Sequence, residues 1–266
     1  MATAFRDRYG PCALVTGASS GIGEHFARAL AASGLDLLLT ARRRERLDAL
    51  AEELHGAHGV RVDVLALDLA DPGFLAPLVA ACAGRDVGLV VSNAGFGVKG
   101  AHDAQPEAEL RAMLHVNALA PMLLAHAFAP RLRARGKGGL VFTGSIESFL
   151  GFPYSAAYAA TKAFVTVLGE GLWGELEQDG VDVLVLAPGA TDTDAPTLQG
   201  IDKAKIPGAL MTPARVVDEA LARLGRGPVH VAGWQNRWMM RLLTMLPRRT
   251  ALRLAGKGIR DTLATK

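Results

Sequence analysis

The chain has 266 residues, half of them apolar, which is enough for one large core and too few for a second full domain. Its net charge of +3 is too small to indicate a nucleic-acid partner, and no apolar stretch reaches the roughly 20 residues that span a bilayer. The first residues contain Arg6 and Arg8 but no apolar run, unlike a secretory signal. Cys12 and Cys82 suit two reduced thiols better than a disulfide framework, so we expect a cytoplasmic location.

Short apolar runs bounded by turn residues alternate with longer helical patterns along the chain. The runs predict strands over 12–16, 35–40, 60–67, 87–92, 140–143, 181–187 and 229–232. The helical patterns cover 22–32, 43–57, 74–83, 107–135 and 156–178. This order predicts an α/β fold: a Rossmann-type doubly wound parallel sheet of about seven strands, with helices on both faces.

We expect a single domain with three parts. Residues 12–193 form the core, 194–225 a loop and helix, and 226–266 the last strand and a basic, apolar-striped tail. The segment 188–211 is rich in Thr, Asp, Gly and Pro, which predicts a mobile loop.

A glycine-rich turn directly follows the first predicted strand and opens the next helix. Its residues are Gly17, Ala18, Ser19, Ser20, Gly21, Ile22 and Gly23. In an open α/β sheet the ligand lies beyond the carboxyl ends of the strands, and glycines there let the backbone approach a pyrophosphate at a helix N-terminus. The turn therefore predicts a dinucleotide site, although the isolated motif is also compatible with a tight turn that binds nothing.

The end of the second predicted strand indicates which dinucleotide is bound. NAD-specific proteins tend to carry an acid there that holds the ribose 2′-hydroxyl, whereas a nearby Arg accommodates a 2′-phosphate. Thr40 and Ala41 are not acidic, and Arg42 and Arg43 follow at once. Cations at a helix N-terminus oppose the helix dipole, so an anionic partner explains them better than an ordinary solvated turn. We predict NADP(H).

Several ordered motifs coincide along the chain: the glycine turn, Asp68 after the third strand, Ser92-Asn93-Ala94-Gly95, Asn117, Ser145, Tyr158-Ala-Ala-Thr-Lys162 and Pro188-Gly189. With these motifs the chain resembles the short-chain dehydrogenase/reductase family over 12–193, which implies that this range is the cofactor-binding and catalytic core and that 194–225 is a substrate loop and helix. Ser92 is a departure, because the family usually has Asn at that position.

Tyr158 and Lys162 lie one helical turn apart, about 6 Å of rise, and so project from the same face of their helix. A phenol is a poor base at neutral pH, and a nearby ammonium favours its phenolate. The pair therefore predicts general acid–base catalysis by Tyr158. Either residue alone would be better interpreted as an interface tyrosine or a solvated lysine.

The resemblance implies further roles. Ser145 would hydrogen-bond the substrate oxygen, Asn117 would hold a water that relays protons toward Lys162, and Lys162 would also bind the nicotinamide ribose. The remaining implied cofactor contacts are Asp68 and Leu69 at the adenine, Asn93, Ala94 and Gly95 along the cofactor, and Pro188, Gly189, Thr191 and Thr193 at the nicotinamide end. A simple helix-capping role for Asp68 stays open.

Apolar residues flank the predicted site on two sides. Ala195, Pro196, Leu198, Ile201, Ile206 and Leu210 offer a lid, and Phe149, Phe152, Pro153 and Tyr154 an aromatic wall. We therefore expect a medium-sized apolar carbonyl or alcohol substrate, such as a ketone, a steroid or an aromatic carbonyl. A 3-oxoacyl thioester reductase is the alternative enzyme, and a non-catalytic NADP(H)-binding redox sensor is the alternative from another class.

Two helices suggest partners. The helix over 156–178 is apolar on most sides, which predicts a homodimer or homotetramer. In the tail, Trp234, Trp238, Leu242 and Leu246 form an apolar stripe with basic flanks. We favour a helix packed on its own subunit or beside the pocket, and keep peripheral contact with an anionic membrane as the alternative.

Overall fold

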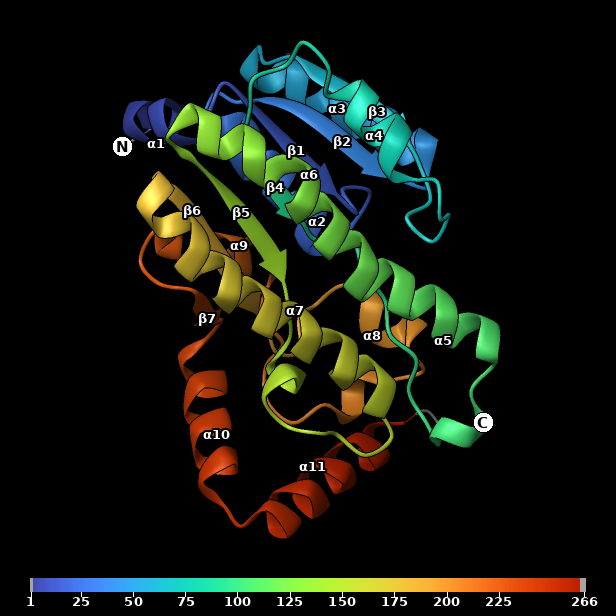
Figure 1. Cartoon of the computed structure of the whole chain (residues 1–266). Coiled ribbons are helices and arrows are strands. Elements are labelled where there is room, and N and C mark those ends of the chain that lie inside the picture. Colours follow the sequence, from blue (N-terminus) through green and yellow to red (C-terminus); the bar gives the residue numbers. More distant parts are fainter. Residues whose placement is uncertain (1, 264–266) are drawn as a thin grey trace.

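A computed structural model describes residues 2–263. Its centre is a seven-stranded parallel sheet in the order β3-β2-β1-β4-β5-β6-β7 (Figure 1). The strands are β1 (Cys12–Thr16), β2 (Asp36–Ala41), β3 (Val62–Ala66), β4 (Val87–Ser92), β5 (Gly138–Thr143), β6 (Val181–Ala187) and β7 (Val229–Val231). The predicted doubly wound α/β fold is confirmed, and every predicted strand is present with its ends within two residues of the expected ones.

Helices cover both faces of the sheet, because the strands are apolar on both sides. On one face lie α2 (Gly21–Ala32), α3 (Arg44–His58) and α9 (Pro213–Arg223), which bury residues such as Phe26, Leu47 and Val216. On the other lie α4 (Leu75–Ala81), α6 (Ala120–Arg135) and α7 (Ala156–Leu176), with Phe128 and Val165 in the core. This arrangement places the carboxyl ends of the central strands and the helix N-termini along one edge.

One continuous helix crosses the second face as α5 (Glu107–Leu114), a π-helical segment (His115–Leu119) and α6. Over Glu107–Arg135 it is long and apolar enough to span a membrane by length and composition, contrary to our expectation. Within its apolar window, 56% of the residues are buried inside the protein, as in a core helix of this fold.

Two helices of eight or more residues were not predicted. At the start, α1 (Ala2–Tyr9) is held on the sheet by ion pairing of Arg8 with Asp182 and by the Tyr9 hydroxyl, which donates to the Asp182 carboxylate at 2.6 Å. In the tail, α11 (Arg248–Thr262) follows α10 (Trp234–Met245), and together they form a V-shaped extension of the sheet domain (Figure 1). The segment expected to be a loop contains a short helix, α8 (Ala195–Leu198), and a 3₁₀ turn over Lys203–Lys205.

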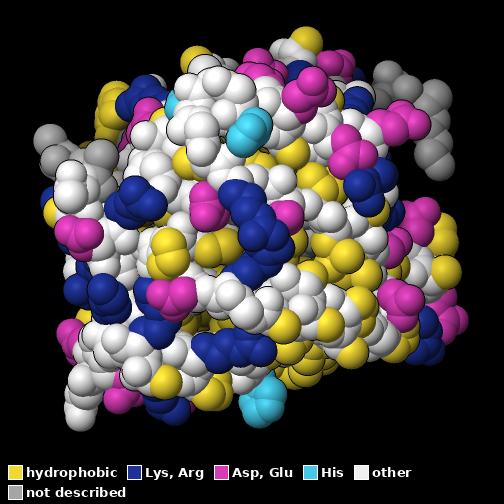
Figure 2. Space-filling view, turned by 90° about the horizontal axis from the view of Figure 1, so that it is seen from above, with side chains coloured by type: hydrophobic (Ala, Val, Ile, Leu, Met, Phe, Trp, Pro, Cys, Tyr) yellow, Lys and Arg dark blue, Asp and Glu magenta, His cyan; other side chains and the backbone are white. Residues whose placement is uncertain are grey.

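A separate small core joins the tail to the segment before and at the start of α7. Leu150, Phe152 and Ala159 pack there against Met240 and Ala251 of the two tail helices. On the face seen from above in Figure 2, basic and acidic side chains are intermixed, in keeping with the small net charge.

Candidate active site

The glycine turn is shaped so that its backbone stays free of side chains. Gly17 has a φ of +67°, and its N–H donates to the Thr40 carbonyl at 2.8 Å, which ties the turn to the end of β2. A Cβ on Gly23 would lie 2.3 Å from the Gly17 carbonyl oxygen and 2.4 Å from Asn93 Nδ2. The turn therefore needs glycine at its first and last positions, and α2 begins within it, at Gly21.

Asn93 braces this turn. Its side-chain amide donates to the Thr16 carbonyl at 3.1 Å, and its Oδ1 accepts a hydrogen bond from Thr143 Oγ1 at 3.2 Å. The backbone N–H groups of Asn93 and Ala94 both donate to Thr16 Oγ1 at 3.0 Å. Asn93 thus connects the carboxyl ends of β1, β4 and β5, the three strands around the predicted cofactor site.

Arg43 lies over the glycine turn, as expected for a residue that meets a 2′-phosphate. Its guanidinium donates to Ser20 Oγ at 2.7 Å and to Ser19 Oγ at 3.0 Å. Arg44 points elsewhere and pairs with Asp48 on its own helix. Arg42 is exposed. The structure therefore brings one of the two predicted arginines to the turn, whereas a role for Arg42 stays a prediction.

Tyr158 and Lys162 project from α7 to the same side, as predicted. Lys162 is buried, and its Nζ donates to the Thr143 carbonyl at 2.8 Å and lies 5.8 Å from the centroid of the Tyr158 ring. Burial lowers the pKa of Lys162 to about 8. Burial raises the pKa of Tyr158, the Glu147 carboxylate raises it further, and a hydrogen bond with Ser145 opposes both effects. Tyr158 therefore holds its proton in this structure and can donate it.

Ser145 and Asn117 flank this pair. Ser145 is buried at the end of β5, and its hydroxyl accepts a hydrogen bond from the Glu147 N–H at 3.1 Å. Asn117 lies in the π-helical segment, where its amide exchanges hydrogen bonds with the backbone N–H and C=O of Phe96. Both Asn117 Oδ1 and Lys162 Nζ lie 3.1 Å from the position that a Cβ on Gly95 would take. The structure thus brings Asn117 and Lys162 together, and the water relay stays a prediction.

The other predicted cofactor residues border the same edge. Thr193 faces the glycine turn, since its methyl group lies 3.0 Å from the position of a Cβ on Gly21. Thr191 is buried and donates to the Gly189 carbonyl at 3.0 Å, and the Pro188 carbonyl accepts from the Ile146 N–H. Further along the edge, Leu69 is buried, and Asp68 is exposed and accepts a hydrogen bond from the Ala70 N–H. This bond lies within a local turn, and the next helix, α4, begins only at Leu75, so the helix-capping alternative for Asp68 is wrong and its adenine contact stays a prediction.

The predicted apolar lid and aromatic wall are only partly right. In the lid, Ile201 is buried, but Leu198 is 80% exposed. In the wall, Phe149 and Phe152 pack with the tail helices. They also line a cavity of about 430 Å³ beside Arg248 and Leu252, together with Ala156, Ala160 and Ala163 of α7. Helical spacing places those alanines on the side of α7 away from Tyr158 and Lys162, neither of which lines the cavity.

Three polar residues near Tyr158 belong to no motif that the sequence analysis identified. Lys99 follows β4 in the loop over 93–101, Glu147 lies two residues after Ser145, and Ser155 precedes α7. Their side chains bond to one another beside the Tyr158 ring. Gly189 is likewise contacted by an unexpected residue, Asn236 of α10, whose amide leaves no room for a Cβ there.

The residues present fit a nicotinamide dinucleotide. The glycine turn offers a backbone cradle that a Cβ would fill, Arg43 supplies a cation at its rim, and the proton-donating pair lies across the same strand ends. When bound, such a cofactor supplies the hydride.

Comparisons with known proteins agree with this site. The sequence profile described as short chain dehydrogenase matches residues 11–202. A 7beta-hydroxysteroid dehydrogenase of Clostridium sardiniense is 30% identical over 253 residues, covering 95% of this chain and 97% of the relative. A very-long-chain 3-oxoacyl-CoA reductase of Podospora anserina is 37% identical over 182 residues, covering 65% of this chain and 53% of the relative.

Two solved structures are also similar. A short-chain dehydrogenase from Sphingobium yanoikuyae in complex with NADPH has a TM-score of 0.80 at 35% identity, covering 90% of this chain and 96% of that one. A bulky-bulky ketone specific alcohol dehydrogenase from Comamonas testosteroni has a TM-score of 0.76 at 32% identity, with the same coverage. The chain belongs to the short-chain dehydrogenase family, and the resemblance found in its motifs is confirmed. It is therefore an oxidoreductase that moves a hydride to or from a carbonyl or alcohol carbon.

Proposed function

We propose that this enzyme uses NADP(H) to interconvert a ketone and a secondary alcohol on a medium-sized apolar substrate. The observation that carries the proposal is that Tyr158 and Lys162 lie along the same sheet edge as the glycine turn, whose serines bind the Arg43 guanidinium. The fold alone would not distinguish an enzyme from a binding protein. A redox sensor would not need Tyr158, Lys162 and Ser145 assembled around one point.

In the reductive direction, each residue has a defined task. Ser145 donates a hydrogen bond to the carbonyl oxygen and stabilises the charge that develops on it. Tyr158 transfers its hydroxyl proton to that oxygen, and the electron pair of its O–H bond remains on the phenolate. The Lys162 ammonium, anchored on the Thr143 carbonyl, stabilises that phenolate.

The relatives support an apolar substrate. Two of them are named for a hydroxysteroid and for bulky ketones, and a third for a very-long-chain 3-oxoacyl-CoA. The third relative keeps a 3-oxoacyl thioester as the second candidate substrate class. Both classes present a carbonyl carbon on a largely apolar body.

The test is oxidation of NADPH and of NADH, followed by absorbance, with a panel of hydroxysteroid-type ketones, bulky aromatic ketones and 3-oxoacyl thioesters. We expect turnover with NADPH on at least one apolar ketone and weaker turnover with NADH. NADPH binding without turnover of any compound would favour the redox sensor, and turnover of thioesters alone would favour the second substrate class.

We further propose that the enzyme forms a homo-oligomer in the cytoplasm. The outer side of α7 carries Phe164 and Val167, and Val167 is 68% exposed, which suits contact with a second copy. The buried free thiols of Cys12 and Cys82 suit a reducing compartment. Light scattering tests the assembly, and a mass near that of one chain would contradict it.

The tail helix presents a second apolar surface. The preferred expectation, that its stripe packs on its own subunit, is wrong: Trp234, Trp238, Leu242 and Leu246 are all exposed, Trp238 by 57%. The helix packs in the small tail core through Met240 and Leu243 on another side. Arg241 lies over the Trp238 ring. From residue 234 to residue 260 the chain carries seven cations and no acid: Arg237, Arg241, Arg248, Arg249, Arg253, Lys257 and Arg260.

We propose that this stripe contacts an anionic membrane surface. An apolar helical face with basic flanks matches such a surface, whereas a self-complementary contact between two copies would bring like charges together. We expect salt-sensitive sedimentation with phosphatidylglycerol vesicles, absent with phosphatidylcholine and lost in the double variant Trp238→Ser, Leu242→Ser. Leu114→Ser, at another exposed leucine, is the matched control. Unchanged sedimentation of the double variant, or a dimer that depends on Trp238, would contradict the proposal.

A further inference from the structure

Lys99, Glu147 and Ser155 form a closed polar cluster next to the catalytic tyrosine. Lys99 Nζ lies 2.6 and 2.8 Å from the two carboxylate oxygens of Glu147 and 2.6 Å from Ser155 Oγ. Ser155 Oγ in turn donates to the Glu147 carboxylate. Only 3% of the Lys99 side chain and 12% of the Glu147 side chain are exposed. Every member of the cluster is thus bonded to both others inside the protein.

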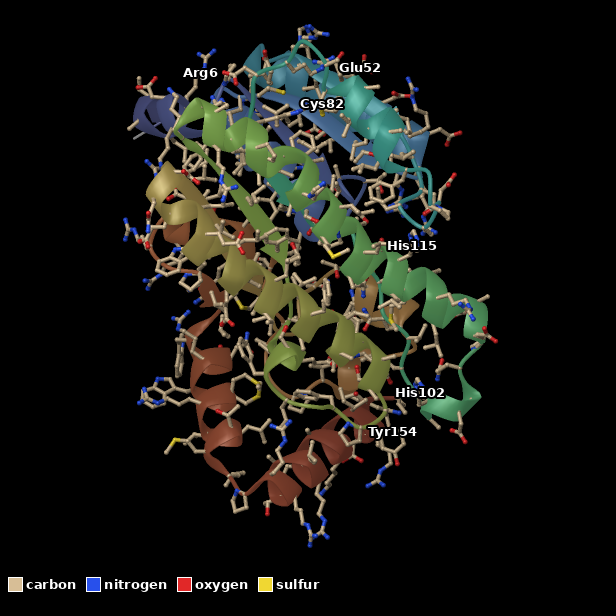
Figure 3. The ribbon with its side chains drawn as sticks, in the orientation of Figure 1. Arg6, Glu52, Cys82, His102, His115 and Tyr154 are labelled. Carbon is tan, nitrogen blue, oxygen red and sulfur yellow. The ribbon has the colours of Figure 1, made fainter. Side chains whose placement is uncertain are left out.

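The cluster joins three segments that meet only at the active site. Lys99 comes from the loop after β4, Glu147 from the 3₁₀ turn after β5 (Ile146–Phe149), and Ser155 from the residue before α7. A backbone hydrogen bond from Gly100 to the Tyr154 carbonyl closes the same junction, and Figure 3 shows Tyr154 at this end of the molecule, near His102. The cluster therefore holds together the three segments that surround Tyr158.

The cation of the cluster lies over the ring of Tyr158. Lys99 Nζ lies 4.4 Å from the centroid of the Tyr158 ring, closer than Lys162 Nζ at 5.8 Å. An ammonium over an aromatic face is attracted by the ring, and attracted more strongly when the phenol loses its proton. A buried ion pair adds little net stability, because the loss of hydration offsets the attraction between the charges. A role in the reaction explains its placement here better than a role in folding.

We propose that Lys99, held by Glu147 and Ser155, is a positioning residue that orients the Tyr158 ring and stabilises its phenolate during turnover. Glu147 acts in the opposite sense, since its negative charge disfavours the phenolate. Three charged groups thus face Tyr158: Lys99 from the loop after β4, Glu147 from the turn after β5 and Lys162 from its own helix. This role rests on the proposed function for its use in catalysis, but the charge effect exists without substrate.

The test is the pH profile of kcat for alcohol oxidation by the full chain, because Tyr158 must lose its proton before it can accept the proton of the alcohol. Burial lowers the pKa of Lys99 and the Glu147 carboxylate opposes this effect, so the variants are compared on the acidic limb of the profile, where Lys99 is an ammonium. We expect Lys99→Met to move the acidic limb to higher pH by about one unit or more, and Glu147→Gln to move it to lower pH. Lys99→Arg should stay near the wild type, and the double variant Lys99→Met, Glu147→Gln should lie between the single variants.

Opposite shifts are the signature of charge, since a merely structural cluster would change both variants in the same direction. Circular dichroism and NADPH binding check that each variant folds. If Lys99→Met does not fold, Ser155→Ala and the neutral double variant still test the proposal. Superimposed pH profiles of all folded variants, or shifts of one sign, would overturn it. Absence of turnover by the wild-type protein would refute the proposed function and with it any role in turnover, whereas turnover with superimposed profiles would overturn this proposal alone.

Discussion

Arg43 is the residue that most directly tests the choice of cofactor. Its guanidinium already bonds to Ser19 and Ser20 of the glycine turn, so it is preorganised where a 2′-phosphate would lie. A hydrogen bond to a charged group contributes about 1.5–3 kcal/mol, which corresponds to about 10- to 150-fold in affinity. Arg43 is exposed, so solvent and salt screen its charge, and we expect the lower end of this range.

Arg43→Ala should therefore weaken NADPH binding about tenfold and leave NADH binding nearly unchanged, as measured by fluorescence titration. The NADPH effect should shrink as salt concentration rises. Arg44→Ala is the matched control, because Arg44 is the next residue and is paired with Asp48 instead of the turn. An equal loss for both cofactors, or an equal effect of Arg44→Ala, would refute the assignment.

Two further predictions follow from the geometry. Gly23→Ala forces a Cβ against the Gly17 carbonyl and Asn93, and should lower the melting temperature and weaken NADPH binding at least about tenfold. Gly56→Ala in α3, where a Cβ meets open space, should instead stabilise the protein by up to about 1 kcal/mol, and a similar response of both variants would contradict this reasoning. Lys162 has a pKa near 8 in the folded protein against an ordinary value of 10.5, so between these values the unfolded chain binds the extra proton and the free energy of unfolding rises with pH. The contribution of neutral Lys162 to the free energy of unfolding is about 3 kcal/mol and is lost as pH falls through about 8. Urea unfolding between about pH 8 and pH 10 should show this rise in the wild type and not in Lys162→Met. Parallel pH dependences of the two proteins would contradict the reasoning.

Much of the fold could be predicted because its strands are short apolar runs between turn residues. The strands Cys12–Thr16, Val87–Ser92 and Val181–Ala187 match their predicted bounds, since strands buried on both faces consist almost entirely of apolar residues. The helix α11 was missed because its apolar residues are few and interrupted by Gly256 and Gly258. Its packing on Phe152 comes from tertiary contacts that a local pattern does not contain.

Some residues of the site could likewise be predicted from the sequence and others could not. The glycine turn, Ser145, Tyr158 and Lys162 occupy fixed local spacings, so their sequence motifs indicated them. Lys99 and Glu147 are 48 residues apart, and neither has a distinctive neighbourhood. Their pairing arises because parallel strands place the loops that follow them at one sheet edge. The exposure of the α10 stripe was only the less favoured alternative, because a stripe shows that a helix is amphipathic without showing which side is covered.

The most direct test of the central claim is the comparison of wild-type protein with Tyr158→Phe in NADPH oxidation with an apolar ketone, together with NADPH binding by fluorescence. The substitution removes only the hydroxyl that gives the proton and keeps the ring beneath Lys99. We predict that turnover falls by at least about 100-fold while the NADPH dissociation constant stays near the wild-type value. Turnover retained by a folded Tyr158→Phe variant would contradict the account.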